Sequence, residues 1–172
     1  MGPIVSRVLT NRSVTMEDIK ERELNKTHSY SDMLKACSIL REASKDAEIL
    51  ILGDYDTDGE LSTYVLVRGL REYGFKNVGY KIPNRENDGY GVSDNIIKYV
   101  ISMAPDIVIT CDNGISAVDR LKLLEDAGIT VIVTDHHAIP EGLDTSSVSA
   151  IINPHLDYKS GLFQDFCGTA VA

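Results

Sequence analysis

The chain has 172 residues, 43% of them hydrophobic and 25% charged, which suits one compact globular domain and argues against a disordered chain. No apolar run approaches the roughly 20 residues needed to cross a bilayer, and no signal-peptide pattern opens the sequence, so the default expectation is a cytoplasmic protein. The net charge of −9 has the wrong sign for a domain that binds nucleic acid by itself, so any contact with DNA must be local or must come from elsewhere.

Residues 1–47 are expected to form a helical lead in front of the main domain. The run Thr15-Met-Glu-Asp has the cap and acidic first turn that are typical of a helix start. A second helical stretch is expected from about Ser31 to Ala47, where apolar residues recur at mostly helical spacing. The 3 cysteines are widely spaced and form no CxxC pair, so we expect buried free thiols rather than disulfides or a zinc site.

From residue 48 onward, short apolar strands alternate with helices. We expect strands at 48–53, 77–82, 106–110, 130–134 and 149–152, and helices at 61–73, 93–103 and 116–127. Strands this apolar are buried on both faces, which predicts an α/β fold with a mostly parallel sheet of about five strands and helices on both faces. In such sheets, ligands bind beyond the carboxyl ends of the strands.

Carboxylate, imidazole and other polar residues follow the expected carboxyl end of strand after strand. The candidate site residues are, in chain order, Asp54, Asp56, Asp58, Gly59, Arg85, Gly89, Gly91, Asp112, Asp135, His136, His137, Asn153 and His155. One Asp in such a place is usually a helix cap, but the alternating Asp54, Asp56 and Asp58 repel one another unless cations neutralise them. With Asp112 and the paired histidines, a bound metal is a simpler explanation than caps and turns.

The ligand types indicate which metal the site prefers. Carboxylates with imidazole and without thiolate favour Mn²⁺, with Mg²⁺ as the alternative and Zn²⁺ less favoured. Several aspartates can bridge a pair of ions roughly 3.5–4 Å apart, and such a pair activates water and steadies an in-line displacement at phosphorus.

Four further positions are candidates for phosphate or substrate binding. Gly59 and Gly91 each lie where a loop is expected to enter a helix, so their backbone N–H groups could meet a phosphate oxygen. Arg85 could clamp a phosphate with two hydrogen bonds, although a surface salt bridge explains it equally well. For Gly89 and Gly91, simple turn chemistry is the alternative.

A series of segments, in order, resembles the motifs of the DHH phosphoesterase family in the form found in RecJ-type single-strand exonucleases. The segments are Asp54-Tyr-Asp-Thr-Asp-Gly59, Asn84-Arg85 through Gly89-Tyr90-Gly91, Asp112-Asn113-Gly114-Ile115 and Asp135-His136-His137. Their order and their places at strand ends match the family from about Ile49 to Pro154. Several motifs in register are far more specific than any one of them.

The resemblance implies a divalent-metal-dependent phosphodiesterase with a pair of Mn²⁺ ions, which digests single-stranded DNA from the 5′ end in DNA repair or recombination. It implies metal-binding roles for a set of acids and one histidine: Asp54, Asp56, Asp58, Asp112 and His136. Asp112 and His136 would then also be catalytic. His137 would face the scissile phosphate and stabilise its charge or the leaving oxygen, while Asp135 would orient a neighbouring histidine. Asn153 would lie at the substrate edge of the site, and His155 is expected to be a solvated loop residue.

Departures from the family pattern leave alternatives open. Leu52 stands where relatives that cleave oligoribonucleotides, cyclic dinucleotides or pyrophosphate have a histidine, which favours the RecJ branch over a phosphodiesterase for nanoRNA or cyclic dinucleotides. A non-catalytic relative that binds a partner protein is a further alternative, and a receiver-like domain fits the paired histidines poorly. The apolar end at 167–172 resembles the start of a family helix that normally continues. Residues 48–172 are therefore expected to be a truncated DHH domain with little activity by itself. The sequence leaves the oligomeric state undetermined.

Overall fold

The computed structural model describes residues 7, 10, 30, 32–84, 91–156 and 166–172. The helix start expected at Thr15 and the candidate residues Arg85 and Gly89 lie outside this described part of the chain. None of the helices within it is both long enough and apolar enough to span a membrane.

A parallel five-stranded sheet forms the centre of the molecule. Its strands are β1 (Glu48–Leu52), β2 (Asn77–Lys81), β3 (Ile107–Cys111), β4 (Thr130–Thr134) and β5 (Ala150–Ile152). They lie in the order β2-β1-β3-β4-β5, and every pairing is parallel. The predicted α/β fold is confirmed, and each strand ends within a residue or so of its expected bounds.

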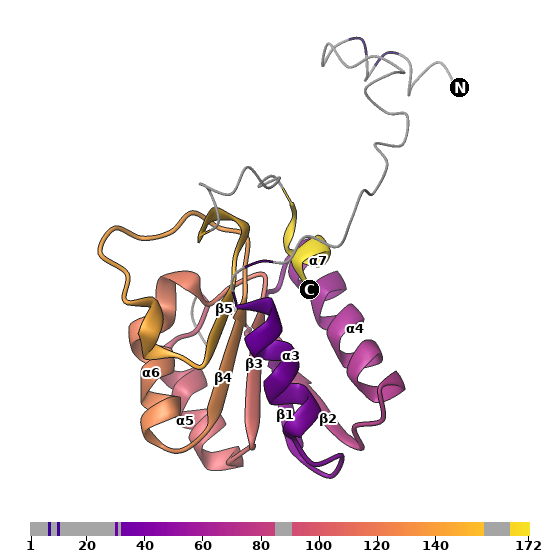
Figure 1. Ribbon diagram of the computed structural model, residues 1–172. Coiled ribbons are helices and arrows are strands. Elements are labelled where there is room, and N and C mark those ends of the chain that lie inside the picture. Colours follow the sequence, from indigo (N-terminus) through magenta and orange to yellow (C-terminus); the bar gives the residue numbers. More distant parts are fainter. Residues whose placement is uncertain (1–6, 8–9, 11–29, 31, 85–90, 157–165) are drawn as a thin grey trace.

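Helices cover both faces of the sheet, as Figure 1 shows, with α3 and α4 on one face and α5 and α6 on the other. The helices are α3 (Met33–Glu42), α4 (Thr57–Glu72), α5 (Asp94–Met103), α6 (Val118–Asp126) and the short α7 (Gly168–Val171). The 3₁₀ turn η1 (Ile115–Ala117) follows β3, and a second one, η2 (Thr145–Ser147), precedes β5. Helix α5 begins, as expected, where Ser93 Oγ accepts a hydrogen bond from the Ile96 N–H.

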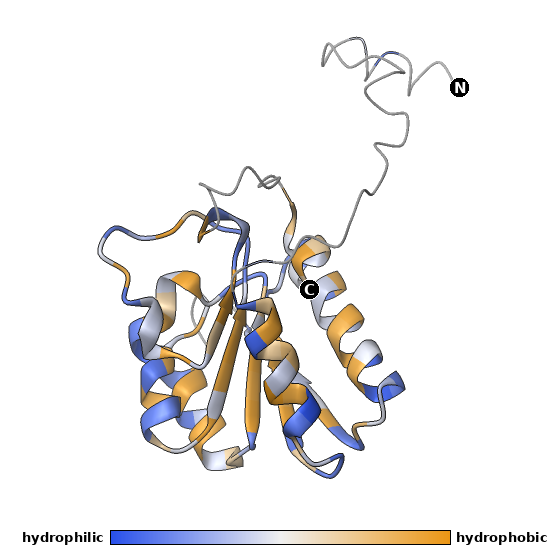
Figure 2. Cartoon of the chain, in the orientation of Figure 1, coloured by the Kyte–Doolittle hydropathy of each residue, from blue (hydrophilic) through white to orange (hydrophobic). Residues whose placement is uncertain are grey.

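The alternation of side chains along each strand divides the core into two halves. Ile49 and Ile51 face the half that α3, α4 and α7 cover, whereas Leu50 and Leu52 face the half that α5 and α6 cover. Successive residues of a strand point to opposite faces, so a strand that is apolar at every position must be covered on both sides. Figure 2 shows the consequence, because the central strands are hydrophobic along most of their length and the hydrophilic residues gather on the outer helix surfaces.

Helix α3 belongs to the same core as the sheet, although it was expected within the lead of residues 1–47. Its buried Ala36 lies in the same apolar cluster as Ile51. Just before the helix, Asp32 Oδ2 accepts a hydrogen bond of 2.9 Å from the Ile151 N–H on β5. That bond satisfies a backbone donor of an edge strand, which would otherwise be open to pairing with another chain.

The cysteines differ from the expectation of buried thiols. Cys111, the last residue of β3, is buried, but Cys37 is only partly buried and Cys167 is exposed. All of them are free thiols in the described part of the chain. Cys111 alone matches the expectation, because it ends a strand that is covered on both faces.

Candidate metal centre

The loop after β1 turns into α4 earlier than expected. Asp56 is the N-cap of this helix, and its Oδ1 accepts a hydrogen bond of 2.9 Å from the Gly59 N–H. The helix therefore begins at Thr57, and Asp58 and Gly59 lie in its first turn rather than in a loop. The Gly59 amide, which was expected to be available for a phosphate, donates to the cap instead.

Glycine at position 59 has a steric reason. A Cβ atom at this position would lie 2.6 Å from both the Cβ and the carbonyl oxygen of Asp54, closer than real Cβ contacts come. Only glycine lets the first turn of α4 pack directly against the loop that carries Asp54.

Asp54 is itself buried, with 6% of its surface exposed, and its Oδ1 accepts a hydrogen bond of 2.7 Å from the Tyr55 N–H. Burial raises the pKa of the Asp54 carboxyl, and the nearby Asp56 adds to the rise, while the Tyr55 hydrogen bond opposes it.

Asp112, directly after β3, has the least favourable surroundings of the acids at this edge. It is 2% exposed, and its backbone has a left-handed φ of 59°, which costs free energy for a residue other than glycine. Its Oδ1 accepts no hydrogen bond from any residue that the structure describes, although His136 Nε2 lies only 3.1 Å away. Burial, followed by the charges of Asp58 and Asp56, raises the pKa of Asp112 to about 7.

Asp135 organises the loop after β4 that carries both histidines. It is 1% exposed, and its Oδ2 accepts a hydrogen bond of 2.9 Å from the Ile115 N–H. Its Oδ1 accepts from the backbone N–H groups of His136 and His137 and lies 2.7 Å from His137 Nδ1. These contacts hold the His137 ring in place, and the orienting role expected for Asp135 stays a prediction.

The surroundings of His137 favour its protonated form. Burial lowers the pKa of the imidazole, but the hydrogen bond and charge of Asp135, with Asp112 and Asp54 behind it, more than reverse that effect and raise the pKa. Half of the side chain is exposed, so the ring is open to a ligand approaching the sheet edge.

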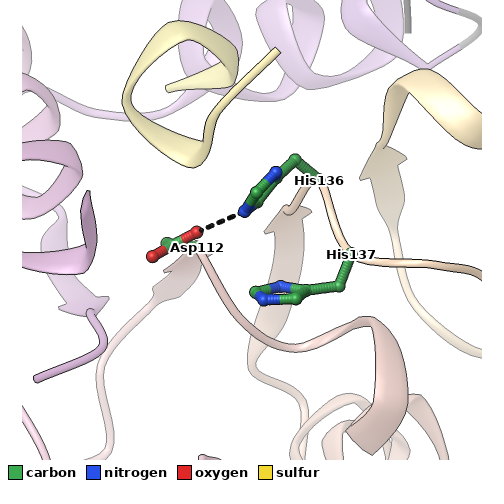
Figure 3. Close-up of side chains that lie close together, drawn as sticks. All are labelled: Asp112, His136 and His137. Carbon is green, nitrogen blue, oxygen red and sulfur yellow. Dashed lines mark ion pairs between the residues drawn. The ribbon is translucent and has the colours of Figure 1, made fainter. Parts of the chain in front are cut away.

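Asp112, His136 and His137 converge at this edge, as Figure 3 shows. One ligand atom from each lies within 4.8 Å of the others. Asp58 Oδ2 lies 3.8 Å from His136 Nε2, so the helix α4 also brings a carboxylate to the group. Asp54 and Asp56, which the sequence also predicts as metal ligands, are not members of this tight group.

The donor atoms suit a cation that prefers oxygen and imidazole nitrogen. Two sulfurs lie near these atoms. Burial raises the pKa of the Cys111 thiol to about 12, so it stays neutral beside the Thr63 hydroxyl. The exposed Cys167 donates a hydrogen bond from its thiol to Asp58. A buried carboxylate oxygen without a hydrogen bond, facing an imidazole nitrogen, is the arrangement that a shared cation would satisfy. The residues therefore fit Mn²⁺ or Mg²⁺ better than a metal that requires thiolate.

Asn153, which was expected at the substrate edge of the site, lies buried beside the loop that carries His137. It is fully buried, its Nδ2 donates a hydrogen bond of 3.0 Å to the His137 carbonyl, and its Oδ1 accepts one of 2.9 Å from the His155 N–H. Both polar ends of the side chain hold loops together, and the substrate contact expected for Asn153 stays a prediction. His155 itself is partly buried. Gly91, another candidate residue, lies in a different loop, where it has a φ of 58° and forms a bend just before Ser93.

Gly168 and Thr169 are neighbours of the site that were not singled out from the sequence. Asp58 Oδ2 accepts a hydrogen bond of 2.6 Å from the Gly168 N–H, and Asp58 Oδ1 accepts from both the N–H and the hydroxyl of Thr169. The sequence signal was limited to a Gly-Thr step before an apolar run. A contact across 110 positions of chain cannot be read from that pattern.

Comparison with known proteins identifies the class. The family model described as the DHH family, N-terminal domain, matches residues 48–172, and the chain belongs to this family. Among curated relatives, the single-stranded-DNA-specific exonuclease RecJ of Haemophilus influenzae is 34% identical over 174 residues, which cover 99% of this chain and 30% of that protein. The RecJ of Escherichia coli is 35% identical over 176 residues, which cover 100% of this chain and 30% of that protein.

Solved structures narrow the class to the RecJ type of DHH domain. A RecJ exonuclease bound to manganese has a TM-score of 0.73 at 32% identity, over 84% of this chain and 36% of that one. RecJ of Thermus thermophilus in complex with Mn²⁺ has a TM-score of 0.70 at 28% identity, over 99% of this chain and 24% of that one. The chain spans about 30% of the length of these two curated relatives.

Proposed function

We propose that the carboxyl edge of the sheet is the divalent-metal centre of a phosphodiesterase that digests single-stranded DNA from its 5′ end. Asp112 carries this proposal, because its buried Oδ1 lacks a hydrogen bond within the described chain and lies 3.1 Å from an imidazole nitrogen. A cation bound by both atoms would satisfy the oxygen and favour the ionised carboxylate. The relatives' names support the substrate, and the manganese in two solved relatives supports the metal.

Asp112 and His136 would hold the metal directly, and Asp58 would contribute a carboxylate from α4. Asp54 and Asp56 lie further from this group and would add negative charge or complete the site for a second ion. When bound, Mn²⁺, or Mg²⁺ as the alternative, supplies Lewis acidity to phosphoryl oxygens and lowers the pKa of water to the range in which it becomes a nucleophile.

His137 would act on the phosphate rather than on the metal. Its Nδ1 is held by Asp135, which leaves Nε2 as the ring nitrogen that can meet a substrate. Because Asp135 raises the pKa of the imidazole, a protonated ring can donate a hydrogen bond to a phosphoryl oxygen and then a proton to the leaving oxygen. The neutral imidazole and the released alcohol balance the transfer of that proton.

The role that we propose for this activity, as the sequence motifs led us to expect, is in DNA repair or recombination in the cytoplasm. The acidic chain, with a net charge of −9, would hold DNA weakly by itself. The activity we propose for the isolated chain is therefore lower than that of the RecJ relatives, of which it spans about 30%.

A side-by-side nuclease assay tests the proposal. The chain is incubated with Mn²⁺ and single-stranded DNA, duplex DNA, a dinucleotide of RNA or a cyclic dinucleotide. We expect mononucleotide release from single-stranded DNA that a chelator abolishes, that Asp112→Ala eliminates and that Asp106→Ala preserves. Asp106 is the matched control, because it is an acid just before the same strand β3 at the opposite edge of the sheet.

The other outcomes each contradict the proposal in a recognisable way. Preferred hydrolysis of the dinucleotides would favour the alternative of a small-substrate phosphodiesterase. Mn²⁺ binding without hydrolysis of any of the substrates would favour a non-catalytic relative that binds a partner protein.

A further inference from the structure

The short helix α7 is attached to the candidate metal centre through one carboxylate. Both oxygens of Asp58 accept hydrogen bonds from its first turn: Oδ2 from the Gly168 N–H at 2.6 Å, and Oδ1 from the Thr169 N–H at 2.9 Å. The Thr169 hydroxyl also donates to Asp58 Oδ1. Burial by itself raises the pKa of the Asp58 carboxyl, but these hydrogen bonds, together with one from the Cys167 thiol, outweigh it and hold the pKa below its ordinary value.

The same turn lies directly against Asp112. A Cβ atom on Gly168 would overlap Asp112 Oδ1 and would come within 2.6 Å of its Cγ. No residue other than glycine can therefore approach the buried oxygen in this way without moving the carboxyl. Figure 3 shows the short helix, in yellow, passing over Asp112 and His136.

Apolar contacts hold α7 in this place. Val171 is buried in the core half that α3 and α4 cover, and Phe166 packs against the same cluster. The Phe166 ring meets Tyr30 edge-on, with centroids 6.5 Å apart. A helix of four residues is not stable by itself, so its position must come from these contacts and from Asp58.

Two interpretations of this contact differ in what they predict. In the structural one, Asp58 merely caps α7, and the metal centre would be indifferent to the cap. In the other, the cap matters to the centre, because the Oδ2 atom that accepts from Gly168 also lies 3.8 Å from His136 Nε2. By holding the Asp58 carboxylate in place, the hydrogen bonds from α7 then set its distance from the His136 imidazole.

We infer that Gly168 and Thr169 form a latch that positions the Asp58 carboxylate against His136 and Asp112, with Thr169 as a positioning residue for the metal centre. This inference rests on the proposed function, since it names residues that shape the same centre. The Thr169 N–H and hydroxyl restrain the side-chain rotamer of Asp58, and Gly168 lets the latch close over Asp112. Outer partners of this kind typically change metal affinity by about 10–100-fold.

Substitution of Thr169 tests the latch. Thr169→Val keeps the shape of the side chain and removes the hydroxyl, whereas Thr169→Ser keeps the hydroxyl and removes a methyl group. Mn²⁺ affinity is measured by calorimetry on the parent chain and both variants. We expect Thr169→Val to bind Mn²⁺ roughly 10-fold more weakly than the parent and Thr169→Ser to stay within about twofold of it.

Amide hydrogen exchange on the metal-free proteins provides the second readout. In Thr169→Val, the amides of 168–172 should exchange faster than in the parent, while those of α6, on the opposite face of the sheet, should be unchanged. Equal Mn²⁺ affinity of Thr169→Val and the parent would overturn the inference, and so would equal losses in Val and Ser. Failure of the parent itself to bind Mn²⁺ would instead overturn the proposed function, so the two failures are distinguishable.

Discussion

The two edges of the sheet carry aspartates in opposite surroundings. At the amino edge, Asp106 Oδ2 accepts a hydrogen bond of 2.8 Å from the Glu48 N–H, and Asp46 Oδ1 pairs with Lys76 Nζ at 2.7 Å. Both aspartates are exposed, so water solvates the remaining lone pairs of their carboxylates. Acids placed in this way align strands and turns at little cost.

At the carboxyl edge, Asp54, Asp112 and Asp135 are 6%, 2% and 1% exposed. Asp135 is fully used by backbone donors and His137, whereas Asp112 keeps a buried oxygen without a hydrogen bond in the described structure and a left-handed backbone. Burying a charge without a partner lowers stability, so the surroundings of Asp112 do not stabilise the metal-free chain, and they support the proposal of a cation site at this edge. The comparison teaches that burial and missing hydrogen-bond partners, more than the presence of acids, distinguish the candidate site from the opposite edge.

The largest difference in stability is expected between substitutions of two glycines of α4, Gly59 in its first turn and Gly69 near its end. Gly59→Ala should lower the free energy of unfolding by about 3 kcal/mol, because the new Cβ meets the Asp54 backbone 2.6 Å away. Gly69→Ala, where nothing lies within 4 Å of the new atom, should raise it by about 0.5–1 kcal/mol through helix propensity. Urea unfolding of both variants measures the difference. Similar effects at the two sites would show that the turn at the carboxyl edge is not tightly packed.

Removing the charge of Asp112 should stabilise the metal-free protein. Asp112→Asn keeps the side-chain shape and tolerates the left-handed backbone, so we expect the free energy of unfolding at pH 8 to rise by on the order of 2 kcal/mol. The folded pKa of about 7 is above the ordinary 3.8, so the contribution of Asp112 to stability is fully present below pH 3.8 and is lost as the pH rises to about 7. The advantage of the variant should therefore grow over this interval and stay constant above it. An unchanged or lower stability at pH 8 would contradict the unfavourable surroundings assigned to Asp112.

Asp106, the matched acid at the amino edge, should stabilise the fold without contributing to metal binding. Asp106→Ala removes the acceptor for the Glu48 N–H and should lower the free energy of unfolding by about 1 kcal/mol. Mn²⁺ affinity, measured by calorimetry, should not change. A loss of Mn²⁺ binding in this variant would mean that acidity in general, rather than the carboxyl edge, attracts the metal.

The smallest effect is expected for the exposed ion pair at the amino edge. Lys76→Ala should change the free energy of unfolding by less than about 0.5 kcal/mol, because both side chains of the Lys76–Asp46 pair are mostly exposed. Chemical denaturation in low and high salt measures it. A change well above 1 kcal/mol would indicate that this edge is more strongly held than its exposure suggests.

The strands and the site edge could be predicted because they depend on local pattern and a topological rule. Apolar runs gave the strand positions, and parallel strands bring their carboxyl ends to one edge, which placed Asp112 beside His136. The start of α4 was placed late, because Asp56 can be read either as a cap or as a ligand. Only the structure shows that the Asp56 carboxylate accepts a hydrogen bond from the Gly59 N–H and so caps the helix.

Contacts between distant segments could not be predicted in the same way. The buried place of Asn153, with its hydrogen bond to the His137 carbonyl, depends on how two loops meet. The Asp58 contact with Thr169 joins positions 111 residues apart, and no periodicity records such a pairing. Sequence pattern therefore predicts which residue types reach the edge of the sheet, while the partners of each side chain depend on packing.

Calorimetric titration of Mn²⁺ into the parent chain, Asp112→Ala and Asp106→Ala tests the central claim most directly. The account predicts binding by the parent and by Asp106→Ala, with a loss of at least roughly 100-fold in Asp112→Ala, because the variant lacks the buried ligand oxygen. Absence of binding by the parent, or equal binding by Asp112→Ala, would contradict a metal centre at the carboxyl edge of the sheet.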